Sequence, residues 1–318
     1  MTLATRVILM LGAGSLLVAC GGSSDGGGGG AAPTATAIID SETAPAMVEA
    51  ALGAALESGA LQDLGGLAAP SGATMSAAIV ESGTSTNGPT AEVQVGPEVI
   101  QCAVSGNISF SADIQNQETI SAGDSFSFSF NNCDEGDESV LNGSFDFEVD
   151  SFTGDMSSEA FAMTVSITVT GFQVFEGGET ATLDGDFTMS LDNTDAPVTT
   201  VSISGNSLSV DNGVESASLS QFSSTVTVDP LTGLTTIDMS GFMMSSEFDG
   251  EIYYETTTPF QFGADGTPIA GEFVVEGAND ASITVMFVGG DSVEMNLDTD
   301  GDGQTDEVIM TTWTELDS

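Results

Sequence analysis

The sequence predicts a mainly β protein, in which a curled antiparallel sheet, barrel-like or folded as a sandwich, follows a short N-terminal helical segment. From about residue 104 onward, apolar residues alternate with Ser, Thr or acidic residues, and this period of two indicates strands with one buried face. Turn-forming runs such as Glu176-Gly177-Gly178 punctuate these stretches. One amphipathic helix cannot cover a sheet of about a dozen strands, so the sheet must bury its apolar face by curling or folding over.

The N-terminal residues have the features of a secretory signal peptide. Arg6 lies in a short n-region, and residues 7–19 form an apolar run that is too short to span a bilayer. The tetrapeptide Leu17-Val18-Ala19-Cys20 resembles the lipobox of bacterial lipoproteins. This resemblance implies cleavage after residues 1–19, acylation of Cys20 and a membrane anchor. The alternative is an ordinary signal peptide with a chance cysteine near its end.

Residues 20–38 are predicted to form a flexible tether that starts at the acylated cysteine, because residues 26–30 are all Gly. The pattern resembles uncharacterised lipoproteins of Gram-negative bacteria. That resemblance implies a location in the cell envelope, lipid-anchored to the outer membrane and facing the periplasm or the cell surface. The residue after Cys20 is Gly21 rather than Asp, which by the same resemblance favours the outer membrane.

Residues 39–103 are predicted to be a helical and loop segment. Apolar residues recur at helical spacing over residues 44–58, where Val48, Ala51 and Leu52 share one face. Asp40, Ser41 and Thr43 are the candidates for the N-terminal cap. Residues 59–100 are rich in Gly, Ala and Ser, so they are expected to be mostly loop, with a second short helix over residues 61–67 as an alternative.

Residues 104–318 are predicted to form the antiparallel β domain. A glycine recurs between apolar neighbours in its strands, at Gly106, Gly143, Gly185, Gly241, Gly250 and Gly271. Curvature of one continuous sheet explains such glycines, because a residue without a side chain permits a kink or a close approach. A ligand that passes close to the glycines is the alternative.

The charge of the chain excludes several classes of function. There are 48 Asp and Glu residues, no His, and a single Lys or Arg, which is Arg6. Cleavage before Cys20 would remove Arg6 and take the formal charge from −47 to −48. Nucleic-acid binding is excluded because it needs cations that displace phosphate counterions. A lysine Schiff base, a histidine base and a His-ligated transition metal are excluded because the chain has no Lys and no His.

Two cysteines remain once Cys20 is assigned to the anchor. Cys102 and Cys133 are predicted to form a structural disulfide, since an even pair in an oxidising compartment normally pairs. Two buried free thiols are the alternative.

Residues 298–307 carry the one motif with metal-binding chemistry. Oxygen donors alternate around Gly301, and this spacing suits Ca²⁺ in a structural role. The predicted ligands are Asp298, Asp300, Asp302, Asp306 and the carbonyl of Gln304. Because Ile309 stands where an EF-hand has its bidentate Glu, the loop resembles the short calcium loops of thrombospondin type 3 and dockerin-like repeats. The alternative is an acidic β-turn, although no cation is present to relieve the repulsion between its carboxylates.

These observations favour a non-enzymatic envelope module that binds or scaffolds a partner protein. One alternative is a carrier of a lipid or another apolar ligand, which would use the C-terminal aromatic and Met residues, namely Tyr253, Tyr254, Phe260, Phe262, Trp313, Met239, Met243 and Met244. A carboxylate-dependent hydrolase is a further alternative, since Asp and Glu are the acid–base groups that the chain retains.

Overall fold

The computed structural model describes residues 34–56, 93–116, 119–134, 136, 139–155, 160–264, 266 and 268–316. The signal peptide, Cys20 and the tether up to residue 33 lie outside these residues, as does the alternative helix at residues 61–67. The helical elements are α2 (Ala44–Leu56), η3 (Ala278–Asp280) and α5 (Trp313–Leu316). The strands are β1 (Val93–Gln101), β2 (Ser105–Ile114), β3 (Ser125–Asp134), β4 (Ser139–Asp155), β5 (Ala160–Glu176), β6 (Glu179–Asp192), β7 (Thr199–Asp211), β8 (Ser216–Asp229), β9 (Leu234–Ser245), β10 (Glu251–Phe262), β11 (Pro268–Glu276), β12 (Ser282–Gly289), β13 (Ser292–Asp298) and β14 (Glu307–Thr312).

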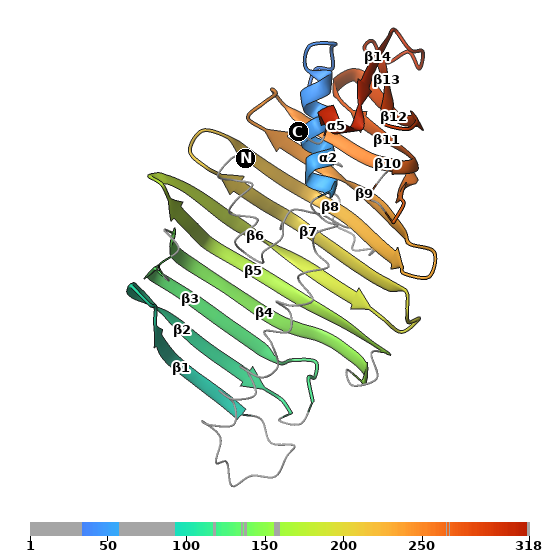
Figure 1. Cartoon of the computed structure of the whole chain (residues 1–318). Coiled ribbons are helices and arrows are strands. Elements are labelled where there is room, and N and C mark those ends of the chain that lie inside the picture. The colour runs from blue at the N-terminus through green and yellow to red at the C-terminus, as the bar shows by residue number, and fades with distance from the viewer. Residues whose placement is uncertain are drawn as a thin grey trace. The chain divides into compact units, whose positions relative to one another are not determined.

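The mainly antiparallel β fold class is confirmed. The strands follow one another in sequence order from β1 to β14 in one antiparallel sheet, which is not closed into a barrel (Figure 1). This order results from short connections, because a strand that returns through a tight turn pairs with its predecessor. The chain divides into two compact units, which we describe separately. The first unit contains β1 to β6, the second contains α2, β8 to β14 and α5, and β7 is shared between them.

In the first unit, the sheet begins earlier than the sequence indicates. β1 starts at Val93, within the stretch that was expected to be loop up to residue 100. The alternation of β1 is hidden because Gly96 and Pro97 interrupt it, and its pairing with β2 shifts register between Val95 and Glu98. A proline is tolerated here because β1 is the first strand of the sheet order, where one side needs no partner.

Two of the recurring glycines coincide with irregular pairing in the first unit. The register shifts between Ser105 and Asn107 in the β2–β3 pair, and between Asn142 and Ser144 in the β4–β5 pair. Gly106 and Gly143 lie at these shifts with positive φ angles, and a Cβ at either would collide with the backbone of the neighbouring strand. Close approach of another strand therefore requires glycine at both positions.

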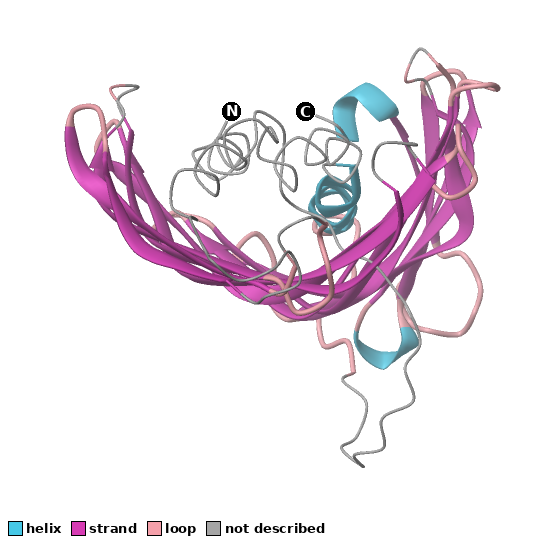
Figure 2. Ribbon diagram, turned by 90° about the horizontal axis from the view of Figure 1, so that it is seen from below, coloured by secondary structure: helices cyan, strands magenta, loops and turns pink. Residues whose placement is uncertain are grey.

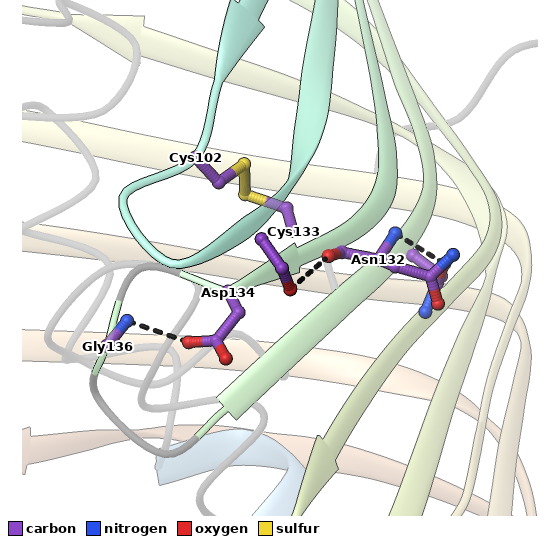
Figure 3. Close-up of a disulfide and its surroundings, with 7 residues drawn as sticks. Cys102, Asn132, Cys133, Asp134 and Gly136 are labelled. Carbon is purple, nitrogen blue, oxygen red and sulfur yellow. Dashed lines mark hydrogen bonds between the residues drawn. A yellow bond between two sulfur atoms is a disulfide. The ribbon is translucent and has the colours of Figure 1, made fainter.

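The disulfide between Cys102 and Cys133 is confirmed in the first unit (Figure 3). It joins the turn after β1 to the end of β3, with a Cα–Cα distance of 5.5 Å and a sequence separation of 31 residues. Both cysteines are buried. Next to it, Asp134 accepts a hydrogen bond from the Gly136 backbone amide at 2.8 Å (Figure 3). The disulfide thus links β1 and β3, which do not pair with each other.

In the second unit, α2 lies on one face of the sheet, where it contacts β9, β11 and α5 (Figure 2). The predicted face is confirmed for Val48, Ala51 and Leu52, which are fully buried, whereas the side chain of Leu56 lies outside the described residues. Asp40 is the capping residue, since its Oδ1 accepts hydrogen bonds from the backbone amides of Glu42 and Thr43 at 3.0 and 2.9 Å.

Aromatic rings form the core beneath this helix. Phe260 and Phe273 are fully buried on neighbouring strands with ring centroids 6.0 Å apart. Phe287 contacts Phe260 at 5.4 Å and Trp313 at 5.2 Å, so the contacts extend across the sheet to α5. Burial of these rings holds β10 to β12 and the C-terminal helix together.

Candidate metal centre

The acidic loop connects β13 to β14, and its own backbone amides shape it. Asp298, the last residue of β13, accepts hydrogen bonds from Gly301 N at Oδ1 (2.9 Å) and from Gly303 N at Oδ2 (2.7 Å). Both glycines have positive φ angles, and these let the chain fold back over the Asp298 carboxylate. Asp298 is consequently 8% exposed although it carries charge.

The other end of the loop is closed by Asp306. Its Oδ2 accepts hydrogen bonds from the backbone amide and from the Oγ1 of Thr299, at 2.9 and 2.7 Å. Its own amide donates to the carbonyl of Leu297 at 2.7 Å. The hydroxyl and then the amide of Thr299 lower the pKa of Asp306 because they bind the charged form.

Three of the predicted ligands meet in this loop. One carboxylate oxygen from each of Asp298, Asp300 and Asp306 lies within 4.8 Å of the other two. The only Lys or Arg of the chain is Arg6, outside the described residues, so no side-chain cation is present in the described part to offset these charges. Such a cluster of hard oxygen donors could bind a metal ion of the Ca²⁺, Mg²⁺ or Mn²⁺ type.

Asp302 does not belong to this group of carboxylates. It contacts Gln304 instead, whose backbone amide and side-chain Nε2 both donate to its carboxylate at 2.8 Å. The physical reason is the Gly303 turn, which brings Gln304 back toward Asp302. The ligand role of the Gln304 carbonyl stays a prediction.

Sequence reasoning missed the support that η3 gives to the loop. A Cβ at Gly301 would collide with the carbonyl oxygen of Asn279, so the loop packs directly against this turn. Asn279 and Asp280 both have positive φ angles, which Asn and Asp tolerate better than most residues. The run Gly277-Ala278-Asn279-Asp280 is a turn signal that could have been noticed.

The aromatic residues proposed for a ligand cavity do not lie on one face. Tyr254, Phe260 and Phe262 are buried on the α2 side of the sheet, while Tyr253 contacts Phe242 at 5.0 Å on the opposite side. The buried rings contact one another, and this favours core packing for these residues.

Two carboxylates approach each other on the face that carries Tyr253. Tyr253 donates a hydrogen bond to Glu255 at 2.8 Å and lies opposite Glu276 in the β10–β11 pair. Partial desolvation, followed by the charges of Glu255 and Asp280, raises the pKa of Glu276. Desolvation and the hydrogen bond to Glu255 raise the pKa of Tyr253. Glu276 is exposed and Tyr253 and Glu255 are half-buried, so these groups form an acidic cluster near the surface of the sheet.

None of the helices in the described part of the chain is long and apolar enough to cross a membrane. Comparison with known proteins gives no further assignment: no family model, no curated protein and no solved structure matches this chain.

Proposed function

We propose that this protein is a lipid-anchored, non-enzymatic module of the bacterial cell envelope that binds or scaffolds a partner and contains a structural calcium site. Cys20 carries the anchor, residues 21–33 are the tether, and the β-rich units face the solvent. The predicted tether is shorter than 20–38 because Thr36 and Ala37 are held on the second unit, where their amides donate to the Glu251 carbonyl at 2.7 and 3.0 Å and Ala37 is fully buried. The disulfide between Cys102 and Cys133 fits an oxidising compartment.

The observation that carries the calcium proposal is the carboxylate cluster of Asp298, Asp300 and Asp306 in a part of the chain that has no cation. Three carboxylates supply part of the six to eight oxygen ligands that Ca²⁺ prefers, and backbone carbonyls and water supply the rest. Calcium would relieve the repulsion between these carboxylates and fix the connection between β13 and β14. Its role is therefore structural.

A thermal melt tests the calcium site. Calcium at about 100 times Kd adds roughly 2.7 kcal/mol to the free energy of unfolding, which raises the Tm of the second unit by about 5–10 °C over the chelated protein. Asp300→Asn should abolish most of this shift, because Asp300 belongs to the cluster, while its carboxylate accepts a 3.2 Å hydrogen bond from the Asp302 amide that an Asn side-chain oxygen can still accept. Asp302→Asn, with the same change in charge, should retain it. An unchanged Tm on chelation would refute a stabilising calcium site.

Labelling with a fatty acid tests the anchor. The wild-type chain, expressed in a Gram-negative host with an alkyne-tagged palmitate, should incorporate label and sediment with the membrane fraction. Cys20→Ser should lose both properties, since acylation occurs on that sulfur. Label that persists in Cys20→Ser, or a wild-type chain released in soluble form, would contradict the anchor.

A further inference from the structure

The outer edge of the last strand, β14, has no partner strand among the residues that the structure describes. Among the described residues, β14 pairs only with β13 (Figure 1). This pairing has no register shift. The amide of Trp313 donates to the Asp291 carbonyl at 2.8 Å, in the same register as the β13–β14 pairs. Hydrogen-bonded pairs alternate along an antiparallel ladder, so Ile309 and Thr311 direct their backbone groups toward β13. The amides and carbonyls of Val308 and Met310 therefore point away from the sheet.

The first and last strands of the sheet, β1 and β14, differ in how their outer edges are protected against strand addition. β1 contains Pro97, which has no amide, and a register shift between Val95 and Glu98, both of which discourage strand addition. β14 has neither a proline nor a bulge. Only its end is capped, where the carboxylate of Glu315 accepts the Thr312 amide at 3.1 Å. No described segment of the chain pairs with the middle of β14, which can therefore accept another strand.

The side chains beside this edge combine apolar and acidic character. Val308 and Met310 are 52% and 58% exposed. Glu294 lies opposite Met310 on β13, and Asn296 donates to its carboxylate at 2.9 Å, which holds the charge next to both apolar residues. Glu307 is exposed at the start of the strand. We call Glu294, Glu307, Val308 and Met310 the edge patch.

We propose that the β14 edge binds an extended, Lys- or Arg-rich segment of another protein as an added β-strand. Backbone hydrogen bonds to Val308 and Met310 would align the segment. Its apolar residues would cover the Val308 and Met310 side chains on one face, and its cations, which alternate with them, would face Glu307 on the other face, within the negative field of the chain. A second copy of this chain carries the same uncompensated negative charge, with a formal net charge of −47, and is therefore disfavoured as the occupant. This inference rests on the proposed binding role and names the class of partner.

Binding of model peptides to the full-length protein tests this proposal. The probe is a fluorescent peptide of about ten residues with alternating Lys and Val, titrated at near-physiological salt and followed by anisotropy. We expect a roughly tenfold loss of affinity when alternate backbone amides of the peptide are methylated, since methylation removes the strand hydrogen bonds but keeps the charge. Met310→Lys should weaken binding to a similar extent. Leu231→Lys is the matched control, because Leu231 is 79% exposed in a turn of the same unit.

Equal affinity for the methylated peptide, or equal weakening by Met310→Lys and Leu231→Lys, would show that the peptide binds through non-specific charge attraction. Either result would overturn the proposal. Concentration-dependent dimers in sedimentation that Met310→Lys abolishes would assign the edge to a second copy and also overturn it. Hydrogen exchange on the wild-type protein provides a measurement without a variant: the peptide should protect the amides of Val308 and Met310. These outcomes leave the calcium melt and the acyl labelling unaffected, so a failure here is distinct from a failure of the proposed function.

Discussion

At the scale of single residues, hydroxyl and amide donors replace the missing cations. Asp40, Asp229 and Asp306 each accept a hydrogen bond from a nearby Thr hydroxyl and from its backbone amide. These bonds favour the charged carboxylate and lower its pKa. A chain without Lys, Arg or His in its described part thus stabilises its acids through local turns, where no long side chain has to be ordered.

Thr299→Val tests this replacement at the metal loop. It removes the hydroxyl that contributes most to the lowered pKa of Asp306, so this pKa should rise toward the ordinary value of 3.8. The folded-state pKa of Asp306 is lowered, so its contribution to stability is present above pH 3.8 and is lost as the pH falls through the folded value. Carboxyl NMR titration in the presence of chelator measures the change. Thr194→Val, beside Asp192, serves as the control, and a change of equal size at Asp306 in that variant would contradict the local cause.

At the scale of secondary-structure elements, covalent and steric restraints set how the strands meet. The disulfide fixes the turn after β1 to β3. Glycines allow close approach at positions where a side chain would collide with a neighbouring strand, as at Gly241 in β9, where a Cβ would lie 2.9 Å from both Phe222 Cα and Tyr254 Oη. The disulfide and the glycine contacts do not involve the acidic side chains, so their contributions to stability can be tested separately from that of charge.

The double variant Cys102→Ser/Cys133→Ser should lower the free energy of unfolding of the first unit. For a loop with a sequence separation of 31 residues, the chain-entropy model gives a loss of roughly 3–4 kcal/mol. Urea denaturation, with separate probes for the two units, measures the effect. The second unit should keep its midpoint, and a loss confined to that unit would argue against this role of the disulfide.

Gly241→Ala and Gly53→Ala should act in opposite directions. The methyl group at Gly241 would force Phe222 and Tyr254 apart, at a cost of about 1–3 kcal/mol. Gly53 lies in α2 with open space around its Cα, so alanine should stabilise the helix by about 0.5–1 kcal/mol. Both residues belong to the second unit, and denaturant midpoints with unchanged slopes would establish the comparison. A neutral Gly241→Ala would show that β9 can move away from its neighbours.

At the scale of the whole molecule, the balance of charge governs stability. The formal net charge of −47 causes self-repulsion that added salt can screen and that no internal ion pair offsets in the described residues. The effect is local at Glu247 and Glu276, whose pKa values are raised first by partial desolvation and then by neighbouring carboxylates. Charge repulsion is therefore expected to lower the stability of the folded protein more at neutral pH and low salt than in mildly acidic or salt-containing solution.

The Tm should reach its maximum in mildly acidic solution. The folded pKa values of Glu247 and Glu276 are raised, so the folded state binds protons first as the pH falls, and stability increases until the ordinary value of 4.5 is passed. Below 3.8 the unfolded state protonates aspartates such as Asp306 that stay charged in the folded state, so stability decreases. Calorimetry with chelator should show a maximum near pH 4–5 and a rise of Tm with salt at pH 7. A Tm that is highest at pH 7 in low salt would contradict this balance.

Much of the fold is local in origin and could be predicted from the sequence. The alternation in Phe126, Phe128 and Phe130 predicts β3, whose three rings are half-buried rather than fully buried. Asp40 followed by the apolar face of residues 48–52 predicts the cap and the helix. The beginning of β1 could not be predicted, because Gly96 and Pro97 break the pattern in a strand that pairs on one side only.

The sequence alone determined the charge, the class of fold, the cysteine pair and the acidic loop, because these depend on residue type and short-range spacing. Only the tertiary structure decided that Asp298, Asp300 and Asp306 converge while Asp302 contacts Gln304, since the path of the loop depends on the positive φ angles of its glycines and on packing against Asn279. It also decided that β14 has no second neighbour in the described part of the chain. Alternation gives each strand its buried face, and the short connections give the sequential order, but neither shows whether a further segment of the described chain covers the outer edge of the last strand.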